Sequence, residues 1–172
     1  APGADDFTPV YEVNYAVDCV LSGCNVPNTD LFGTRGDSFR IFRSFNSGAE
    51  NCIARRSRYF GAGEGYGMMF AHSTNCWARG GSFDAMRHGV VFQGSTNCTA
   101  TDVYVDYPRQ APLDFHGANE IGCRVVNPTC TASTSHETVA GVAPVGIAFG
   151  NPTNLAGSHK CGVIGGRFSG FK

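Results

Sequence analysis

The sequence predicts an all-β solenoid, in which short strands repeat along the chain and stack coil upon coil. One phrase occurs twice, at 67–78 and again at 89–100, with a shift of 22 residues. A fixed period in this range is typical of solenoid repeats. Apolar residues within each copy alternate with period two, which suits strands and not helices. No stretch of ten or more residues carries apolar side chains at helical spacing.

A recurring cysteine, followed two positions later by Ala or Val, sets the predicted register of the coils. Successive members of this series are 28, 24, 22, 25 and 38 residues apart. Equivalent positions in stacked coils are about 4.8 Å apart, so neighbouring thiols are close enough for disulfides without requiring them. Buried cysteine also packs as a small hydrophobe. Cys19 and Cys130 fall outside the predicted inward column, which comprises Cys24, Cys52, Cys76, Cys98, Cys123 and Cys161.

Two further apolar clusters predict the other strands of each coil. The first of these clusters follows most of the cysteines by six to eight residues. Gly and Asn separate the clusters, and both residues tolerate the positive φ of tight turns. Three short strands per coil, stacked in register, would form parallel sheets. The remaining cluster is a Phe with an apolar residue two places before it: Met68/Phe70, Val90/Phe92, Leu113/Phe115 and Ile147/Phe149.

These features resemble the right-handed parallel β-helix of the pectate-lyase-like superfamily, which includes phage tailspikes. The resemblance covers the chain roughly from Asn14 to its end. It rests on the coil length, the inward columns and the Asn-containing turn before the cysteine strand. It implies an all-β fold of about six to seven coils with three short strands each. Because this fold hosts lyases, hydrolases, epimerases and adhesins, it indicates activity poorly.

We expect a single domain. Residues 1–13 read as an extended arm or the end of an upstream segment, and residues 14–172 as the β-helix, with loop insertions at 127–144 and 151–160. With a net charge of −1, the chain has no overall positive field that would attract nucleic acid. No apolar run approaches the ~18 residues of a membrane span.

The expected partners follow from the ends of the solenoid. A solenoid needs caps, and the sequence has no amphipathic capping helix. We expect neighbouring subunits or flanking chain segments to cap the ends, since the chain reads as a processed product or excised piece. The likeness to tailspikes implies a homotrimer. The expected location is extracellular or on a virion surface.

The predicted carbohydrate-binding strip follows from the cysteine register. With Cys52 and Ala54 inward, Arg55 points outward, and Trp77 and Arg79 are expected to stand beside it on the next coil. The Trp ring offers stacking to a sugar, and Arg suits the carboxylates of an acidic polysaccharide. The alternative is that Trp77 packs under a loop or a neighbouring subunit. The full predicted set is Trp77, Arg55, Arg79, Gln93 and Arg124.

A predicted catalytic cluster comprises Asp114, His116 and Glu120. With Leu113 and Phe115 inward, Asp114 and His116 point outward, and Glu120 lies just round the turn. Such residues can act as a general acid and base, and two carboxylates can cleave a glycosidic bond. The alternative is that Asp114 and Glu120 accept hydrogen bonds from turn amides.

Metal and cofactor sites are not expected from the sequence. There is no C-x2-C pair for zinc, and the interior of such a coil is narrow and apolar. No stacked column of acidic residues supports the calcium-dependent chemistry of pectate lyases. Asn28-Thr29-Asp30 resembles the NTD motif of polygalacturonases, but the paired Asp and the Arg-Ile-Lys of that family are missing. We interpret it as a turn.

Three functional hypotheses remain. The first is a carbohydrate-recognition domain of a tailspike-like or adhesin-like protein. The second is a polysaccharide-degrading enzyme, a hydrolase before a lyase. The third is a purely structural β-helix module of a virion or surface appendage.

Overall fold

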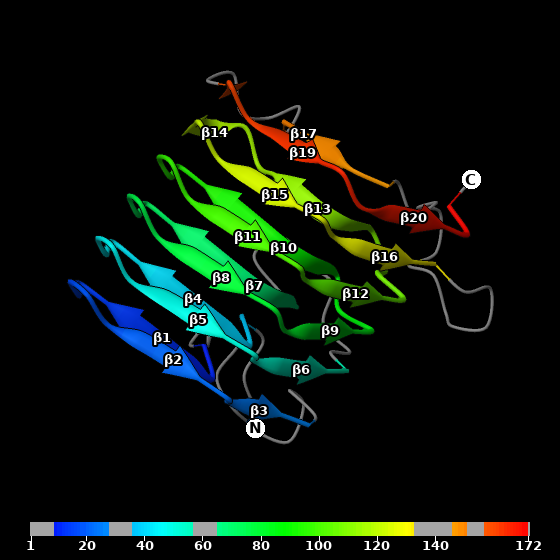
Figure 1. Cartoon of the computed structure of the whole chain (residues 1–172), viewed down its shortest axis with the longest axis horizontal. Helices are drawn as coiled ribbons and strands as arrows, with labels where there is room; N and C mark the ends of the chain where they lie inside the picture. Colours follow the sequence, from blue (N-terminus) through cyan, green and yellow to red (C-terminus); the bar gives the residue numbers. More distant parts are fainter. Residues whose placement is uncertain (1–8, 28–35, 57–64, 133–145, 151–156, 172) are drawn as a thin grey trace.

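A computed structural model describes residues 9–27, 36–56, 65–132, 146–150 and 157–171. Within these ranges all regular secondary structure is β-strand, and the strands form three six-stranded parallel sheets and one two-stranded pair. Figure 1 shows the coils lying side by side from β1 at one end to β20 at the other. No helix of the described part of the chain is long and apolar enough to cross a membrane.

Each sheet takes one strand from each coil. The first sheet contains β1 (Tyr11–Asn14), β4 (Phe39–Phe42), β7 (Tyr66–Ala71), β10 (His88–Gln93), β13 (Ala111–Phe115) and β17 (Ala148–Phe149). The second contains β2 (Val20–Ser22), β5 (Gly48–Glu50), β8 (Trp77–Arg79), β11 (Thr99–Thr101), β15 (Arg124–Val126) and β19 (Gly162–Ile164). The third contains β3 (Asn25–Val26), β6 (Ile53–Arg55), β9 (Ser82–Asp84), β12 (Tyr104–Asp106), β16 (Thr129–Thr131) and β20 (Arg167–Ser169). The additional pair is β14 (Ala118–Ile121) with β18 (Gly157–His159).

This topology is a parallel β-helix of about six coils, as the repeat predicted. Successive strands of the chain pass from the first sheet to the second and third, and then return to the first one coil further on. Because the pairing is parallel and in register, equivalent side chains of neighbouring coils stack in columns.

The phenylalanine column is confirmed. Phe70, Phe92 and Phe115 are fully buried inside the first sheet. Their ring centroids lie 5.1 and 5.2 Å apart with nearly parallel planes, and Phe149 continues the stack at 4.7 Å. Offset-stacked rings add to the stability from burial alone. Phe149 is 55% exposed, so the column ends there.

The cysteine column is only partly as predicted. Ala49 pairs with Ala78, so Ser47 lies level with Cys76. Cys52 instead precedes β6 of the third sheet, one corner further along the coil. The prediction was wrong for Cys24 and Cys52 because the Cys-x-Ala pattern leads into strands of two different sheets. The observed column comprises Cys19, Ser47, Cys76, Cys98, Cys123 and Cys161.

Serine and cysteine make equivalent hydrogen bonds to backbone carbonyls in this column. Each donates to the carbonyl two residues before it: the Ser47 hydroxyl to Phe45 at 3.0 Å, and the Cys76 thiol to Thr74 at 3.4 Å. All eight cysteines are free thiols. The neighbouring thiols of Cys123 and Cys76, together with burial, raise the pKa of Cys98. A raised pKa keeps a thiol protonated at neutral pH, as in an inert packing residue.

The domain boundaries also need correction. The β-helix begins before residue 14, since β1 starts at Tyr11 and pairs with β4. The insertion predicted at 127–144 starts later, because Thr129–Thr131 are β16 and pair within the third sheet. Part of the insertion predicted at 151–160 is β18, which pairs with β14. The other residues of both insertions, and Asn28 to Asp30, lie outside the described residues.

Candidate functional site

The outer face of the first sheet is buried over its central strands. Met69 and Val91 point away from the phenylalanine column but are only 7% and 0% exposed. They belong to a second apolar cluster, separate from the core, with Tyr66, Ala71 and the partly buried Phe42. Polar side chains on this face therefore lie in a partly desolvated environment.

Asp114 and His116 lie together on this face, as predicted. Asp114 pairs with Val91 of the preceding coil. Its Oδ2 lies 3.0 Å from Nδ1 of His116, so that nitrogen carries the proton and donates it. The Asp114 side chain is 7% exposed and that of His116 is 22% exposed. The hydrogen bond to Asp114 raises the pKa of His116, against the opposing effect of burial.

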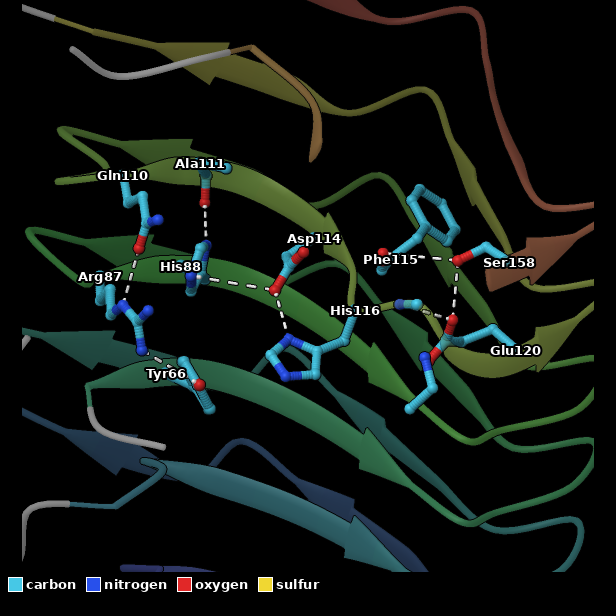
Figure 2. Close-up of polar contacts among 12 residues, drawn as sticks. Tyr66, Arg87, His88, Gln110, Ala111, Asp114, Phe115, His116, Glu120 and Ser158 are labelled. Carbon is cyan, nitrogen blue, oxygen red and sulfur yellow. Dashed lines mark hydrogen bonds and ion pairs between the residues drawn. The ribbon is translucent and has the colours of Figure 1, made fainter. Parts of the chain in front are cut away.

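His88 is a third member of this cluster. Its Nδ1 lies 3.0 Å from the carbonyl oxygen of Ala111, which can only accept, so Nδ1 is the protonated nitrogen. Its Nε2 faces Oδ2 of Asp114 at 3.9 Å (Figure 2). Burial lowers the pKa of His88 to about 4, despite the neighbouring carboxylate. The ring is therefore neutral at physiological pH.

The side chain of His88 lies on the outer face, although strict alternation from Val90 would place it inside. A Cβ on Gly89 would lie 2.5 Å from the Val105 side chain, so position 89 faces the interior like Val90. The pairs on either side of Gly89, His88 with Tyr66 and Val90 with Met68, keep the same register, so the alternation changes there without an inserted residue. A glycine inside a strand is a signal for such an irregularity.

Arg87 and Tyr66 close one side of the cluster. Arg87 Nε donates to Oε1 of Gln110 at 2.8 Å, and its Nη1 donates to the Tyr66 hydroxyl at 3.2 Å. The guanidinium also lies 5.7 Å from the centre of the Tyr66 ring, which packs at 5.4 Å from His88. Figure 2 shows these residues approaching from neighbouring coils.

Glu120 is not part of this cluster and serves the turn instead. It is fully buried, and its oxygens accept from the amides of Gly94, Gly117 and Ala118, each at 2.9 Å. The Ser158 hydroxyl donates to it at 2.7 Å. The alternative stated above, a carboxylate that binds turn amides, is confirmed for Glu120. With its oxygens occupied, Glu120 does not supply a second carboxylate beside Asp114.

The outer face of the second sheet is partly exposed, and the half-buried Trp77 lies flat on it. A Cβ on the neighbouring Gly48 would fall 2.3 Å from the indole ring, so only glycine lets the ring lie against the backbone. The Arg79 guanidinium stands 5.4 Å from the ring centre. Thr99 and Arg124 continue the Trp77 column on the next two coils.

The predicted carbohydrate-binding set is divided among three sheets. Trp77, Arg79 and Arg124 share the second sheet. Arg55 lies on the third sheet, where it pairs with Asp84, because the cysteine register behind its assignment was wrong. Gln93 lies on the first sheet opposite Ala71. The sequence did not reveal Gly48, whose missing side chain makes room for the indole.

With the side chains where they stand, the described residues contain no group of three or more His, Cys, Asp or Glu at metal-binding spacing. No protein-family model matches this chain, and no significant match is found among curated proteins or solved structures.

Proposed function

We propose that this protein is a carbohydrate-recognition β-helix and that it binds sugar on the open outer face of the second sheet. The observation that carries the proposal is the half-buried indole of Trp77, which lies flat against Gly48 on a partly exposed face. A flat aromatic ring fixed by the backbone stacks on a sugar ring at little entropic cost, because it is already ordered.

The polar neighbours of Trp77 suit a sugar with acidic groups. Arg79 and Arg124 are exposed on the same face, and Thr99 and Thr101 are half-buried between them. Guanidinium groups bind carboxylates through two parallel hydrogen bonds. Threonine hydroxyls both donate to and accept from sugar hydroxyls. We therefore assign the ligand to acidic polysaccharides.

The setting we propose is an exported or virion-surface protein of the pectate-lyase-like β-helix type, acting within a larger chain or assembly. A homotrimer is part of this proposal. Sedimentation analysis of the purified chain tests that part directly: a trimer mass supports it, and a monomer mass at high protein concentration contradicts it.

The binding experiment is a titration of the chain with acidic and neutral oligosaccharides. Trp77→Ala should weaken binding of the acidic ligand roughly tenfold, the scale of a lost aromatic contact. Arg124→Ala should weaken it less, and added salt should reduce that difference. The matched control is Tyr104→Ala, which removes a 40% exposed ring from the third sheet. Equal affinity of the wild type and the Trp77 variant would refute the proposal.

An enzyme that degrades polysaccharides is a second candidate, supported by one observation. Asp114 orients His116 through Nδ1, which leaves Nε2 of the partly exposed ring available as a general base. Depolymerisation that is lost in His116→Gln but kept in His72→Gln would support this candidate. Without detectable depolymerisation in the wild type, recognition alone remains.

A further inference from the structure

We propose that a second copy of this chain adds head to tail at the ends of the second sheet, so that β2 of one copy pairs with β19 of the other. In the described part of the chain these strands are the two edges of that sheet, and Figure 1 shows them at opposite ends of the stack of coils. Edge strands carry backbone N–H and C=O groups that a strand from another chain can pair with. The contact is confined to the second sheet, because Val13 and Val26, at the same end of the other two sheets, are buried.

The backbone ladder of the second sheet already contains the bond that such a contact would repeat. At every step between coils, the amide of the first strand residue donates to the carbonyl of the residue before its partner in the preceding coil. These bonds run from Gly48 to Cys19, Trp77 to Ser47, Thr99 to Cys76, Arg124 to Cys98 and Gly162 to Cys123, at 2.8 to 3.1 Å. The next step of the ladder would join the Val20 amide of a second copy to the Cys161 carbonyl of the first.

The two edges are accessible and partly apolar. Val20 is 51% exposed and Ile164 is 49% exposed. Leu21 and Val163 pack against the core at the two ends of one inward column, but both are only half-buried. A stacked copy would place these two side chains against each other and remove apolar surface of both from water.

A column of residues at the corner before the second sheet ends in opposite charges. Its members occupy equivalent places in successive coils, and all have a positive φ, between 48° and 66°. They are Asp18, Asn46, Asn75, Asn97, Gly122 and Lys160. Asp, Asn and Gly adopt this backbone conformation more readily than Lys does. The first and last members are both exposed, so the column ends in an accessible carboxylate and an accessible ammonium group.

A head-to-tail contact would bring these two charges together. Lys160 of one copy would stand beside Asp18 of the next, about 4.8 Å away along the column. Within one copy, Asp18 Oδ1 accepts from Nδ2 of Asn46 at 2.5 Å on the opposite side. The sequence around each end has the same asymmetry. Residues 1–27 contain four acidic and no basic side chains, whereas residues 138–172 contain three Lys or Arg and no acidic side chain. Opposite charges therefore favour head-to-tail over head-to-head pairing.

The first test is sedimentation velocity of the full chain at low salt and rising protein concentration. A head-to-tail contact does not close, so the mass should keep rising with concentration, unlike the fixed mass of a side-by-side trimer. Added salt should weaken the association. Asp18→Lys replaces attraction by repulsion and should weaken it roughly tenfold. The double variant, Asp18→Lys with Lys160→Asp, should restore it.

The matched control is Asp102→Lys. Asp102 is also an exposed aspartate with a positive φ, 52°, at a corner of the second sheet, but it lies in a central coil. The substitution makes the same change in charge and backbone demand away from both edges, so this variant should associate like the wild type.

The second test captures the register with diamide, an oxidant that takes one hydrogen atom from each of two thiols as their S–S bond forms. Cys19 and Cys161 are free thiols at the two ends of the observed cysteine column. Within one copy, five coil spacings of roughly 24 Å in total separate them, too far for a disulfide. At the junction they would be neighbours about 4.8 Å apart. We expect peptide mass spectrometry to find a Cys19–Cys161 disulfide between chains.

That disulfide, together with a mass that rises with concentration, would support the proposal. A fixed monomer or trimer mass without the disulfide would overturn it, as would Asp18→Lys associating as tightly as the wild type. Protection of the Val20–Ser22 amides from hydrogen exchange in a chain of fixed monomer mass would also overturn it, because another segment of the same chain would then cover the edge.

Discussion

The outer faces of the first and second sheets are built from the same alternating strands but end in opposite environments. On the first sheet the outward residues Met69 and Val91 are as buried as core residues. On the second sheet, Arg79 and Arg124 are exposed. Position in a β-helix therefore does not decide whether an outward side chain serves packing or binding. What decides it is whether the face is covered.

The same difference separates the two polar clusters. The Asp114 carboxylate in the first cluster, and the separate Glu120 carboxylate in the nearby turn, are buried and accept hydrogen bonds from named donors. Around Trp77, Arg79 is exposed and Thr99 is half-buried. Burial strengthens hydrogen bonds and makes unpaired groups costly. We therefore expect substitutions on the first sheet to act on stability and those on the second to act on binding.

The largest effect is expected at Glu120. Glu120→Gln replaces one acceptor oxygen by an NH₂ group facing backbone donors, and should lower the free energy of unfolding by about 4 kcal/mol. The matched change, Glu50→Gln on the outer face of the second sheet, should cost less than about 0.5 kcal/mol. Urea unfolding measures both. A loss under about 1 kcal/mol in Glu120→Gln would mean that the carboxylate does not hold the turn.

A pH dependence from His88 is expected next. The unfolded chain takes up this proton near pH 6.5, whereas burial lowers the folded pKa to about 4. The folded state is therefore progressively disfavoured as pH falls from about 6.5 to 4, by about 3 kcal/mol in total. The stability advantage of wild type over His88→Gln should shrink across that window. A constant difference would show that His88 is solvated or already protonated in the fold.

Met69 offers a direct comparison of the two faces. Met69→Ala should cost about 2 kcal/mol, near the lower end for buried large-to-small changes, because a little of the side chain is exposed. Thr101→Ala, outward on the second sheet, should stay within about 0.5 kcal/mol of wild type. Equal effects in thermal or urea unfolding would remove the distinction between the faces.

Apart from the control substitutions, the smallest stability effect is expected at Trp77. A ring that lies on an open sheet beside Arg79 should contribute about 1 kcal/mol of packing and cation–π energy. Trp77→Ala should therefore leave the chain folded while weakening sugar binding roughly tenfold. A loss of 3–5 kcal/mol, roughly the cost of truncating a core Trp, would instead make Trp77 a packing residue.

The sequence predicted the architecture well because the repeat period corresponds to one complete coil of three strands. The phenylalanine column and the outward position of Asp114 followed from period-two alternation alone. The register between coils was harder to predict, because Cys52-x-Ala54 and Cys76-x-Ala78 look alike yet lead into different sheets. That one-corner error moved Arg55 away from Trp77.

The positions of His88, Glu120 and Trp77 depend on features that the alternation of apolar residues does not reveal. His88 reaches Asp114 only because Gly89 makes an irregularity that reverses the direction of the preceding side chains. The bridge between Thr96 and Ile121 places Glu120 level with the buried Ser95. Glu120 therefore has a structural role, which its predicted position just round the turn did not indicate. Trp77 lies flat because Gly48, 29 residues earlier, has no side chain.

Hydroxyl-radical footprinting read by mass spectrometry tests the contrast between the two outer faces most directly. Methionine reacts readily whenever it is accessible, so Met69 is a sensitive reporter of the first face and Trp77 of the second. We predict that Trp77 is modified readily while Met69 is protected to the same degree as the core residue Met68. Oxidation of Met69 as fast as that of Trp77, in a chain that remains folded, would contradict the account.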